Sequence, residues 1–157
     1  MKNHLLEQTR TILHEEQPID TRLHKICTLL NSTLLGYDWV GFYLVDPTQE
    51  KMLKLGPYVG SPTDHVFIPF GKGICGQAAE SLATFVVPDV SKESNYLSCS
   101  LTVKSEIVLP LIHEGVFLGE LDIDSHVIDR FQVEDQALLE EMCLLISPFL
   151  AMSVKKP

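Results

Sequence analysis

The residues best suited to chemistry gather in the segment Cys99–Ser125, CSLTVKSEIVLPLIHEGVFLGELDIDS, which combines a cysteine with several acids. Two runs of strand-forming residues, Glu106–Ile112 and Val116–Ile123, flank the turn residues His113–Gly115. Strands joined by a three-residue loop with a glycine form a common β-hairpin. Because most of the strand residues around the acids are apolar, we expect a hairpin that is buried on both faces.

Three acids are expected to meet at the open end of this hairpin. With a three-residue loop, Glu106 lies opposite Asp122, and Asp124 lies diagonally beyond it on the same face. Like charges at short range raise the pKa of at least one carboxyl group, so such a cluster either binds a cation or holds a proton ready for donation. The alternative is a solvated hairpin end without a function.

Two cysteines are candidates for reactive thiols. Cys99 lies near the end of the long polar stretch 88–104, and a loop of this length in a compact domain is usually a lid or a binding segment. Cys75 follows Gly71-Lys72-Gly73 and falls in the first turn of a predicted helix, where the helix dipole would stabilise a thiolate. The alternative for Cys75 is a small buried thiol that fills space beside glycines.

The stretch Asp38–Asp46, DWVGFYLVD, is predicted to be a strand. Trp39, Gly41 and Tyr43 then share one face, because side chains alternate along a strand. A glycine between two aromatic residues leaves a recess that could hold an apolar or cationic ligand against the rings. The alternative is that both rings belong to the ordinary core.

The order of the predicted elements indicates an α+β fold. Two helices come first, several strands and one central helix follow, and the hairpin precedes a final helix with acids in its first turn. This order predicts a single mainly antiparallel sheet with helices packed against it. We expect one domain over residues 1–157, with the N-terminal helices within residues 1–36 as part of it. The predicted elements are helices at 5–15, 20–35, 74–82 and 134–150, and strands at 38–46, 52–55, 66–69, 84–87, 106–112 and 116–123.

Composition and charge narrow the class of protein. With 45% hydrophobic and 21% charged residues, the chain resembles an ordinary globular protein. Its net charge of -9 argues against nucleic acid or an anionic membrane as partner, so we expect a small molecule or a protein. The first residues lack an apolar run of signal-peptide length, and we expect a cytoplasmic protein with reduced cysteines. The spacing of the four cysteines and six histidines predicts no metal site.

Several motifs together resemble those of a GAF domain. They are WVGFYLV, LGPY, IPFGKGICGQAA, SEIVLPL and GELDIDS, and they extend from about Trp39 to the last helix. The combination looks most like the stand-alone GAF proteins that act as free methionine-(R)-sulfoxide reductases. A GAF domain as such implies only a module that binds small molecules, because the fold carries many functions.

The resemblance implies roles for particular residues. Cys99 matches the cysteine that attacks the sulfoxide, and Cys75 matches the family's cysteine at the central helix. The family's substrate-binding acids match Glu106, Asp122 and Asp124, and its pocket aromatics match Trp39 and Tyr43. Family members that recycle through a disulfide usually have another cysteine shortly before the Ile-Pro pair, and here His65 stands at that place, where we expect at most an accessory role.

Two functions are therefore expected as alternatives. In the first, Cys99 reduces free methionine sulfoxide and becomes a sulfenic acid, which Cys75 or an external thiol system such as thioredoxin reduces, with no bound cofactor. In the second, the chain is a non-catalytic module that binds or senses a small ligand or a redox state, and it dimerises through its terminal helices. The end of the chain just after the last helix favours the enzyme, and the missing cysteine favours the module.

Overall fold

The computed structural model describes residues 1–94 and 102–154. Cys99, the predicted nucleophile, lies outside the described residues, as does the middle of the polar stretch that contains it.

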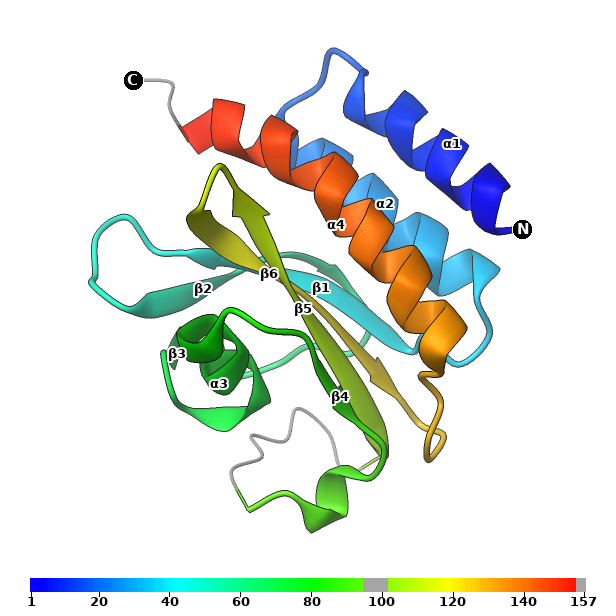
Figure 1. The fold of residues 1–157 in the computed structure, drawn as a ribbon, viewed down its shortest axis with the longest axis vertical. Coiled ribbons are helices and arrows are strands. Elements are labelled where there is room, and N and C mark those ends of the chain that lie inside the picture. The colour runs from blue at the N-terminus through cyan, green and yellow to red at the C-terminus, as the bar shows by residue number, and fades with distance from the viewer. Residues whose placement is uncertain (95–101, 155–157) are drawn as a thin grey trace.

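A six-stranded sheet forms the centre of the molecule (Figure 1). Its strand order is β3-β2-β1-β6-β5-β4, and every neighbouring pair is antiparallel. The strands are β1 (Trp39–Val45), β2 (Met52–Val59), β3 (Phe67–Pro69), β4 (Phe85–Val87), β5 (Ser105–His113) and β6 (Val116–Ser125). The predicted α+β fold with one antiparallel sheet is confirmed.

Helices cover the two faces of the sheet unequally (Figure 1). The helices α1 (Lys2–Leu13), α2 (Ile19–Thr33) and α4 (Val133–Val154) lie on one face, and the nine-residue helix α3 (Gly73–Ser81) lies on the other. A short 3-10 helix, η1 (Val90–Lys92), follows β4. Each face has its own cluster of buried apolar side chains, and the cluster on the side of α1, α2 and α4 is the larger one.

Helix α4 is apolar and long enough to cross a membrane by length and composition alone. Its buried side chains, however, pack into the core together with α1, α2 and the strands β5 and β6. A helix that is apolar on most sides is expected in such a position. We therefore interpret α4 as a core helix. Cys143 on α4 and Cys27 on α2 are both buried in this core, as their helical spacing predicts.

The hairpin of β5 and β6 has a different register from the predicted one. Glu114 and Gly115 both have positive φ, 50° and 79°, and form a two-residue turn that pairs His113 with Val116. An irregularity at Leu111 then shifts the pairing by one further residue. The predicted register was wrong by two residues.

In the observed register Glu106 lies opposite Asp124, and Asp122 lies opposite Val108. Because side chains alternate with a period of two, a shift of two residues leaves every side chain on its predicted face. Glu106, Asp122 and Asp124 therefore still share one face, which is the face that α3 covers.

Candidate functional site

Three neighbouring strands bring the candidate residues together on the α3 side of the sheet. On the central strand β6, Asp122 lies between Gly41 of β1 and Val108 of β5. The rows on either side complete the same face: Trp39, Asp124 and Glu106 form one row, and Tyr43, Glu120 and Pro110 form the other. Residues far apart in the sequence are thus placed side by side by strand pairing alone.

The acids of this face are buried. Glu106 is 5% exposed, and Asp122 and Asp124 are each 2% exposed. The thiol of Cys75 donates a hydrogen bond to Asp122, with 3.3 Å between Sγ and Oδ2. Donor atoms of Cys75, Glu106 and Asp122 lie within 4.8 Å of one another. These three side chains are close enough together to contact one small chemical group of a ligand. The absence of a metal site, predicted from the cysteine and histidine spacing, stays a prediction.

Burial shifts the protonation of these acids. Loss of solvent, followed by the charges of Asp122 and Asp124, raises the pKa of Glu106 well above its ordinary value. Burial and the charge of Asp122 do the same to the pKa of Asp124. Burial also raises the pKa of Asp122, but hydrogen bonds from Glu106 and Cys75 oppose that shift. Asp122 is therefore the acid of the three whose charged form receives the most support from hydrogen bonds.

The predicted thiolate at Cys75 is wrong. Burial raises the pKa of the Cys75 thiol well above its ordinary value, and the nearby acids, Asp122 first, raise it further. These effects outweigh the helix dipole, because a thiolate here would lack solvent and face negative charges. Cys75 is a protonated, buried thiol, which is the alternative left open by the sequence.

A small hollow of about 10 Å³, with room for roughly one water molecule, lies between the sheet and the start of α3. Its lining residues are Tyr43, His65, Ile68, Lys72, Gly73, Ile74, Cys75, Glu106 and Asp122. His65 and Cys75 therefore border the same space, and an accessory role of His65 stays a prediction. Trp39 and Asp124, although predicted to bind substrate, are not among the residues that line the hollow.

The recess predicted between Trp39 and Tyr43 is filled by the indole ring itself. A Cβ atom placed on Gly41 would lie 2.4 Å from the Trp39 ring, so the ring lies directly over the glycine. The ring also stacks on Tyr58, with 5.3 Å between centroids. The prediction of a ligand recess here was wrong, because the glycine makes room for a neighbouring side chain.

Both aromatic residues instead hold the chain between β2 and β3. Trp39 Nε1 donates a hydrogen bond to the carbonyl oxygen of Ser61 at 3.0 Å. Tyr43 Oη donates one to the carbonyl oxygen of His65 at 2.9 Å. These bonds fix the backbone at His65 beside the hollow.

One buried acid of the site face was missed. Glu120 is fully buried, and in the described part of the chain neither of its carboxylate oxygens has a hydrogen-bond partner. Burial, followed by the charge of Asp122, raises the pKa of Glu120 well above its ordinary value, and the nearby Cys75 thiol, although it donates its hydrogen bond to Asp122, opposes that shift. The signal was present in the sequence, because Glu120 precedes Asp122 by two positions and must share its face.

The position of α3 depends on a close approach of backbone to backbone. A Cβ atom on Gly76 would lie 2.6 Å from the carbonyl oxygen of Pro69, at the end of β3. Only glycine lets the first turn of the helix come this near. The GICG motif thus places Cys75 within reach of the acids on the sheet.

Comparison with known proteins agrees with this arrangement. The model of the family described as GAF domain matches residues 18–148. The chain belongs to the GAF domain family. Among its relatives is the free methionine-R-sulfoxide reductase of Saccharomyces cerevisiae, which is 36% identical over 93% of this chain and 86% of the relative. The enzyme of that name from Escherichia coli is also 36% identical, over 80% of this chain and 78% of the relative.

A solved structure of a relative is also similar to this chain in fold and in sequence. It is the free methionine-R-sulfoxide reductase of Neisseria meningitidis in complex with its substrate, with a TM-score of 0.90 and 33% identity. The match covers 98% of this chain and 90% of that one. This GAF domain thus shares its backbone with enzymes of that name over nearly its full length.

Proposed function

We propose that the protein is an oxidoreductase that reduces free L-methionine-(R)-sulfoxide to methionine, with Cys99 as the nucleophile. The observation that carries the proposal is the meeting of Cys75, Glu106 and Asp122 at one buried hollow, in a chain similar to reductases of this name. We propose that it acts in the cytoplasm, without a bound cofactor and as a homodimer through its terminal helices.

The acids suit the ammonium group of a free amino acid. Burial raises the pKa of all three acids, and hydrogen bonds from Glu106 and Cys75 oppose that shift at Asp122, so Asp122 is the acid best suited to face an ammonium group. Asp122 Oδ2 accepts the hydrogen bond from Cys75, whereas Oδ1 has no hydrogen-bond partner among the described residues, and an unsatisfied buried polar atom is costly. An ammonium group has three N–H donors and can supply that partner.

The neutral acids suit the departing oxygen. The sulfur of Cys99 attacks the sulfoxide sulfur, the sulfoxide S–O bond breaks, and the oxygen is transferred to Cys99 as a sulfenic acid. Glu106 or Asp124 donates a proton to this oxygen as negative charge develops on it, and recovers a proton from the Cys99 thiol. The methionine is released with its sulfur reduced and Cys99 oxidised by two electrons.

We propose that Cys75 completes the cycle. When its sulfur attacks the sulfenic acid, a disulfide forms and the hydroxyl group leaves as water. The thiol proton of Cys75 passes to the departing hydroxyl group by way of Asp122, which already accepts its hydrogen bond, so that water forms. An external dithiol such as thioredoxin then reduces the disulfide, and a small thiol can reduce the sulfenic acid directly.

The raised pKa of Cys75 favours a second candidate function. A thiol that stays protonated at neutral pH attacks slowly without a base. Together with His65 in place of the family's further cysteine, this fits a module that binds or senses a ligand without turnover.

The deciding experiment measures methionine release from the free (R)-sulfoxide with dithiothreitol as reductant. We expect turnover in the wild type and none in Cys99→Ser, whereas Cys27→Ser, a matched change of a thiol buried in the helical core, should keep the activity. Peptide mapping after oxidation by substrate without reductant should show a Cys75–Cys99 disulfide or a sulfenic acid at Cys99. Absence of methionine release in the wild type would leave the ligand-binding module as the function.

A matched gain-of-function variant tests the place of His65. His65 and Cys75 line the same hollow, so a cysteine at position 65 would lie near the Cys75 thiol. We expect His65→Cys to accelerate recycling by thioredoxin, with first-turnover methionine release unchanged. An unchanged recycling rate would show that position 65 lies beyond disulfide reach of Cys99.

A further inference from the structure

One thiol and two carboxyl groups converge on the hollow from three separate elements. Cys75 comes from α3, Glu106 from β5 and Asp122 from β6, and all three line the space. Their donor atoms lie within 4.8 Å of one another. The prediction of no metal site used the spacing of cysteines and histidines along the sequence, and such spacing cannot detect ligands that only the fold brings together.

The same face of the sheet holds buried carboxylate oxygens without partners. In the described part of the chain, the buried side-chain oxygens that have no hydrogen-bond partner are both oxygens of Glu120, Oδ1 of Asp122 and Oδ1 of Asp124. Asp122 is 2% exposed and lines the hollow, and its other oxygen, Oδ2, accepts the hydrogen bond from Cys75. Buried carboxylates in proteins are paired with a cation or coordinate a metal ion, so these oxygens favour a cation in the hollow.

The size of the hollow and the thiol determine the kind of cation. About 10 Å³ holds roughly one water molecule, so a cation must bind there without a shell of its own waters. Mg²⁺ keeps several waters and Ca²⁺ takes about six to eight oxygen ligands, whereas Zn²⁺ needs only about four ligands and binds thiolate as well as carboxylate. Zinc bonds of about 2.0–2.3 Å hold tetrahedral ligand atoms roughly 3.3–3.7 Å apart. The 3.3 Å between Cys75 Sγ and Asp122 Oδ2 already matches that separation.

We propose that Cys75, Glu106 and Asp122 bind one Zn²⁺ ion, as three protein ligands that leave the fourth position open. On binding, the thiol and the carboxyl groups release their protons to solvent, and zinc keeps its oxidation state. The two positive charges of the ion favour the ionised forms of all three ligands, which reverses the effect of their burial and mutual repulsion.

The ion is an inhibitor and not a cofactor. This consequence rests on the proposed function, in which Glu106 and Asp122 contact the substrate and Cys75 resolves the sulfenic acid. A zinc ion held by these three side chains blocks both steps. The protein would then reduce methionine sulfoxide only while free zinc is scarce.

The binding test uses Co²⁺ as a spectroscopic probe, because tetrahedral cobalt with a thiolate ligand has a thiolate-to-metal charge-transfer band. Titration of the reduced full-length chain with cobalt chloride should produce this band, and zinc chloride should remove it. Cys75→Ser should abolish the band and weaken zinc binding in calorimetry at least about 100-fold, since loss of a group that only orients a ligand already costs about 10–100-fold. Asp122→Asn should weaken zinc binding about tenfold or more by the same argument. The control Cys143→Ser changes a buried thiol in the helical core and should alter neither measurement.

The outcomes separate the metal site from the proposed function. A band that persists in Cys75→Ser but disappears in Cys99→Ser, or equal zinc affinity of the wild type, Cys75→Ser and Asp122→Asn, would overturn the site. Inhibition is measured as first-turnover methionine release without any reductant, because thiol reductants themselves bind zinc. Zinc should abolish this release and a chelator should restore it. Cobalt bound at Cys75 with undiminished release would overturn the inhibitory role, and cobalt bound there without release from the metal-free protein would retain the site and reject the reductase.

Discussion

Glu120 offers the sharpest test of how the site face is maintained. Glu120→Met replaces a fully buried carboxyl group by an apolar side chain of similar length. An unsatisfied buried polar group costs about 1–3 kcal/mol, so we expect the free energy of unfolding to rise by about that amount. For a domain of this size, each kcal/mol corresponds to about 2–4 °C in Tm.

The gain from Glu120→Met should depend on pH with a definite sign. In the unfolded chain Glu120 titrates near its ordinary pKa of 4.5, and in the folded chain its pKa is well above that. The folded state therefore holds this proton more tightly, and its contribution to stability is complete below about pH 4.5 and is lost as the pH rises through the folded pKa. Glu120→Met has no carboxyl group at this position, so its free energy of unfolding should exceed that of the wild type by more at pH 8 than at pH 5.

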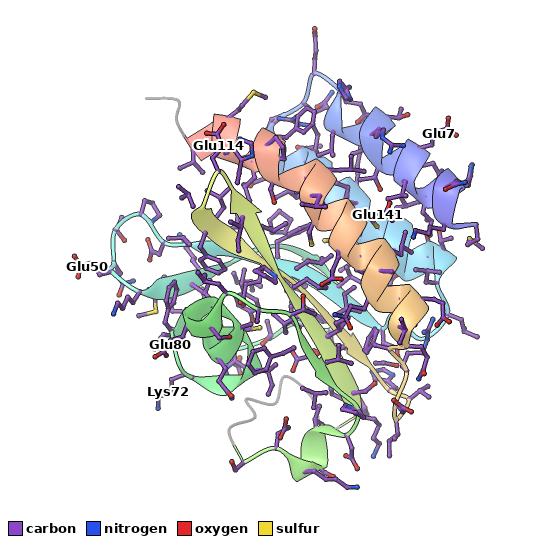
Figure 2. The ribbon with its side chains drawn as sticks, in the orientation of Figure 1. Glu7, Glu50, Lys72, Glu80, Glu114 and Glu141 are labelled. Carbon is purple, nitrogen blue, oxygen red and sulfur yellow. The ribbon has the colours of Figure 1, made fainter. Side chains whose placement is uncertain are left out.

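Urea unfolding followed by the fluorescence of Trp39, the single tryptophan, measures both quantities. Glu50→Met is the matched control, since Glu50 is exposed on the turn after β1 and its side chain points to solvent in Figure 2. The free energy of unfolding of Glu50→Met should stay within about 0.5 kcal/mol of the wild-type value. A less stable Glu120→Met protein at pH 8, or one with the same pH slope as the wild type, would show that Glu120 has a hydrogen-bonded, ionised role in the fold.

Other variants test single contacts of the site. Asp122→Asn removes the largest nearby charge acting on Cys75, so the pKa of the Cys75 thiol should fall. Alkylation of Cys75 at pH 8, measured by mass spectrometry, should then be faster than in the wild type. An unchanged rate of alkylation would mean that burial alone protects the thiol. Gly76→Ala places a Cβ against the carbonyl oxygen of Pro69 and should cost about 1–3 kcal/mol of stability in urea unfolding, whereas a neutral effect would show that α3 can move away freely. Tyr43→Phe removes the bond to the chain between β2 and β3 and should cost about 1 kcal/mol, with unchanged stability counting against that anchor.

The parts of the site that follow from strand periodicity were predictable. Alternation alone assigns Glu106, Asp122 and Asp124 to one face, and the error of two residues in register did not disturb it. The register itself depended on the conformation of Glu114 and on a shift at Leu111, neither of which has a unique sequence signal. The face of the sheet on which each acid lies was predictable, and the residue opposite each acid was not.

The parts that depend on solvent and on side-chain packing were not predictable. The dipole argument for a Cys75 thiolate requires some exposure to water, and the sequence does not say that the first turn of α3 is sealed against the sheet. A glycine between two aromatic residues predicts an open recess, but the space above a glycine can equally be filled by a neighbouring ring, as it is by Trp39 above Gly41. Both errors came from local patterns whose meaning is set by distant residues.

The sheet separates two populations of side chains that alternate along the same strands. On β6, Leu121 and Ile123 belong to the larger apolar cluster on one face of the sheet, whereas Asp122 and Asp124 lie on the face that α3 covers. Substitutions in the apolar cluster therefore alter folding stability, and substitutions on the opposite face act on the buried acids, with effects on stability as well, as at Glu120. A domain arranged in this way can acquire new ligands by exchanging every second residue on three strands while its helical side stays unchanged, and it can tolerate several buried acids without loss of the fold. A deep mutational scan should reveal this as two interleaved patterns of constraint with a period of two.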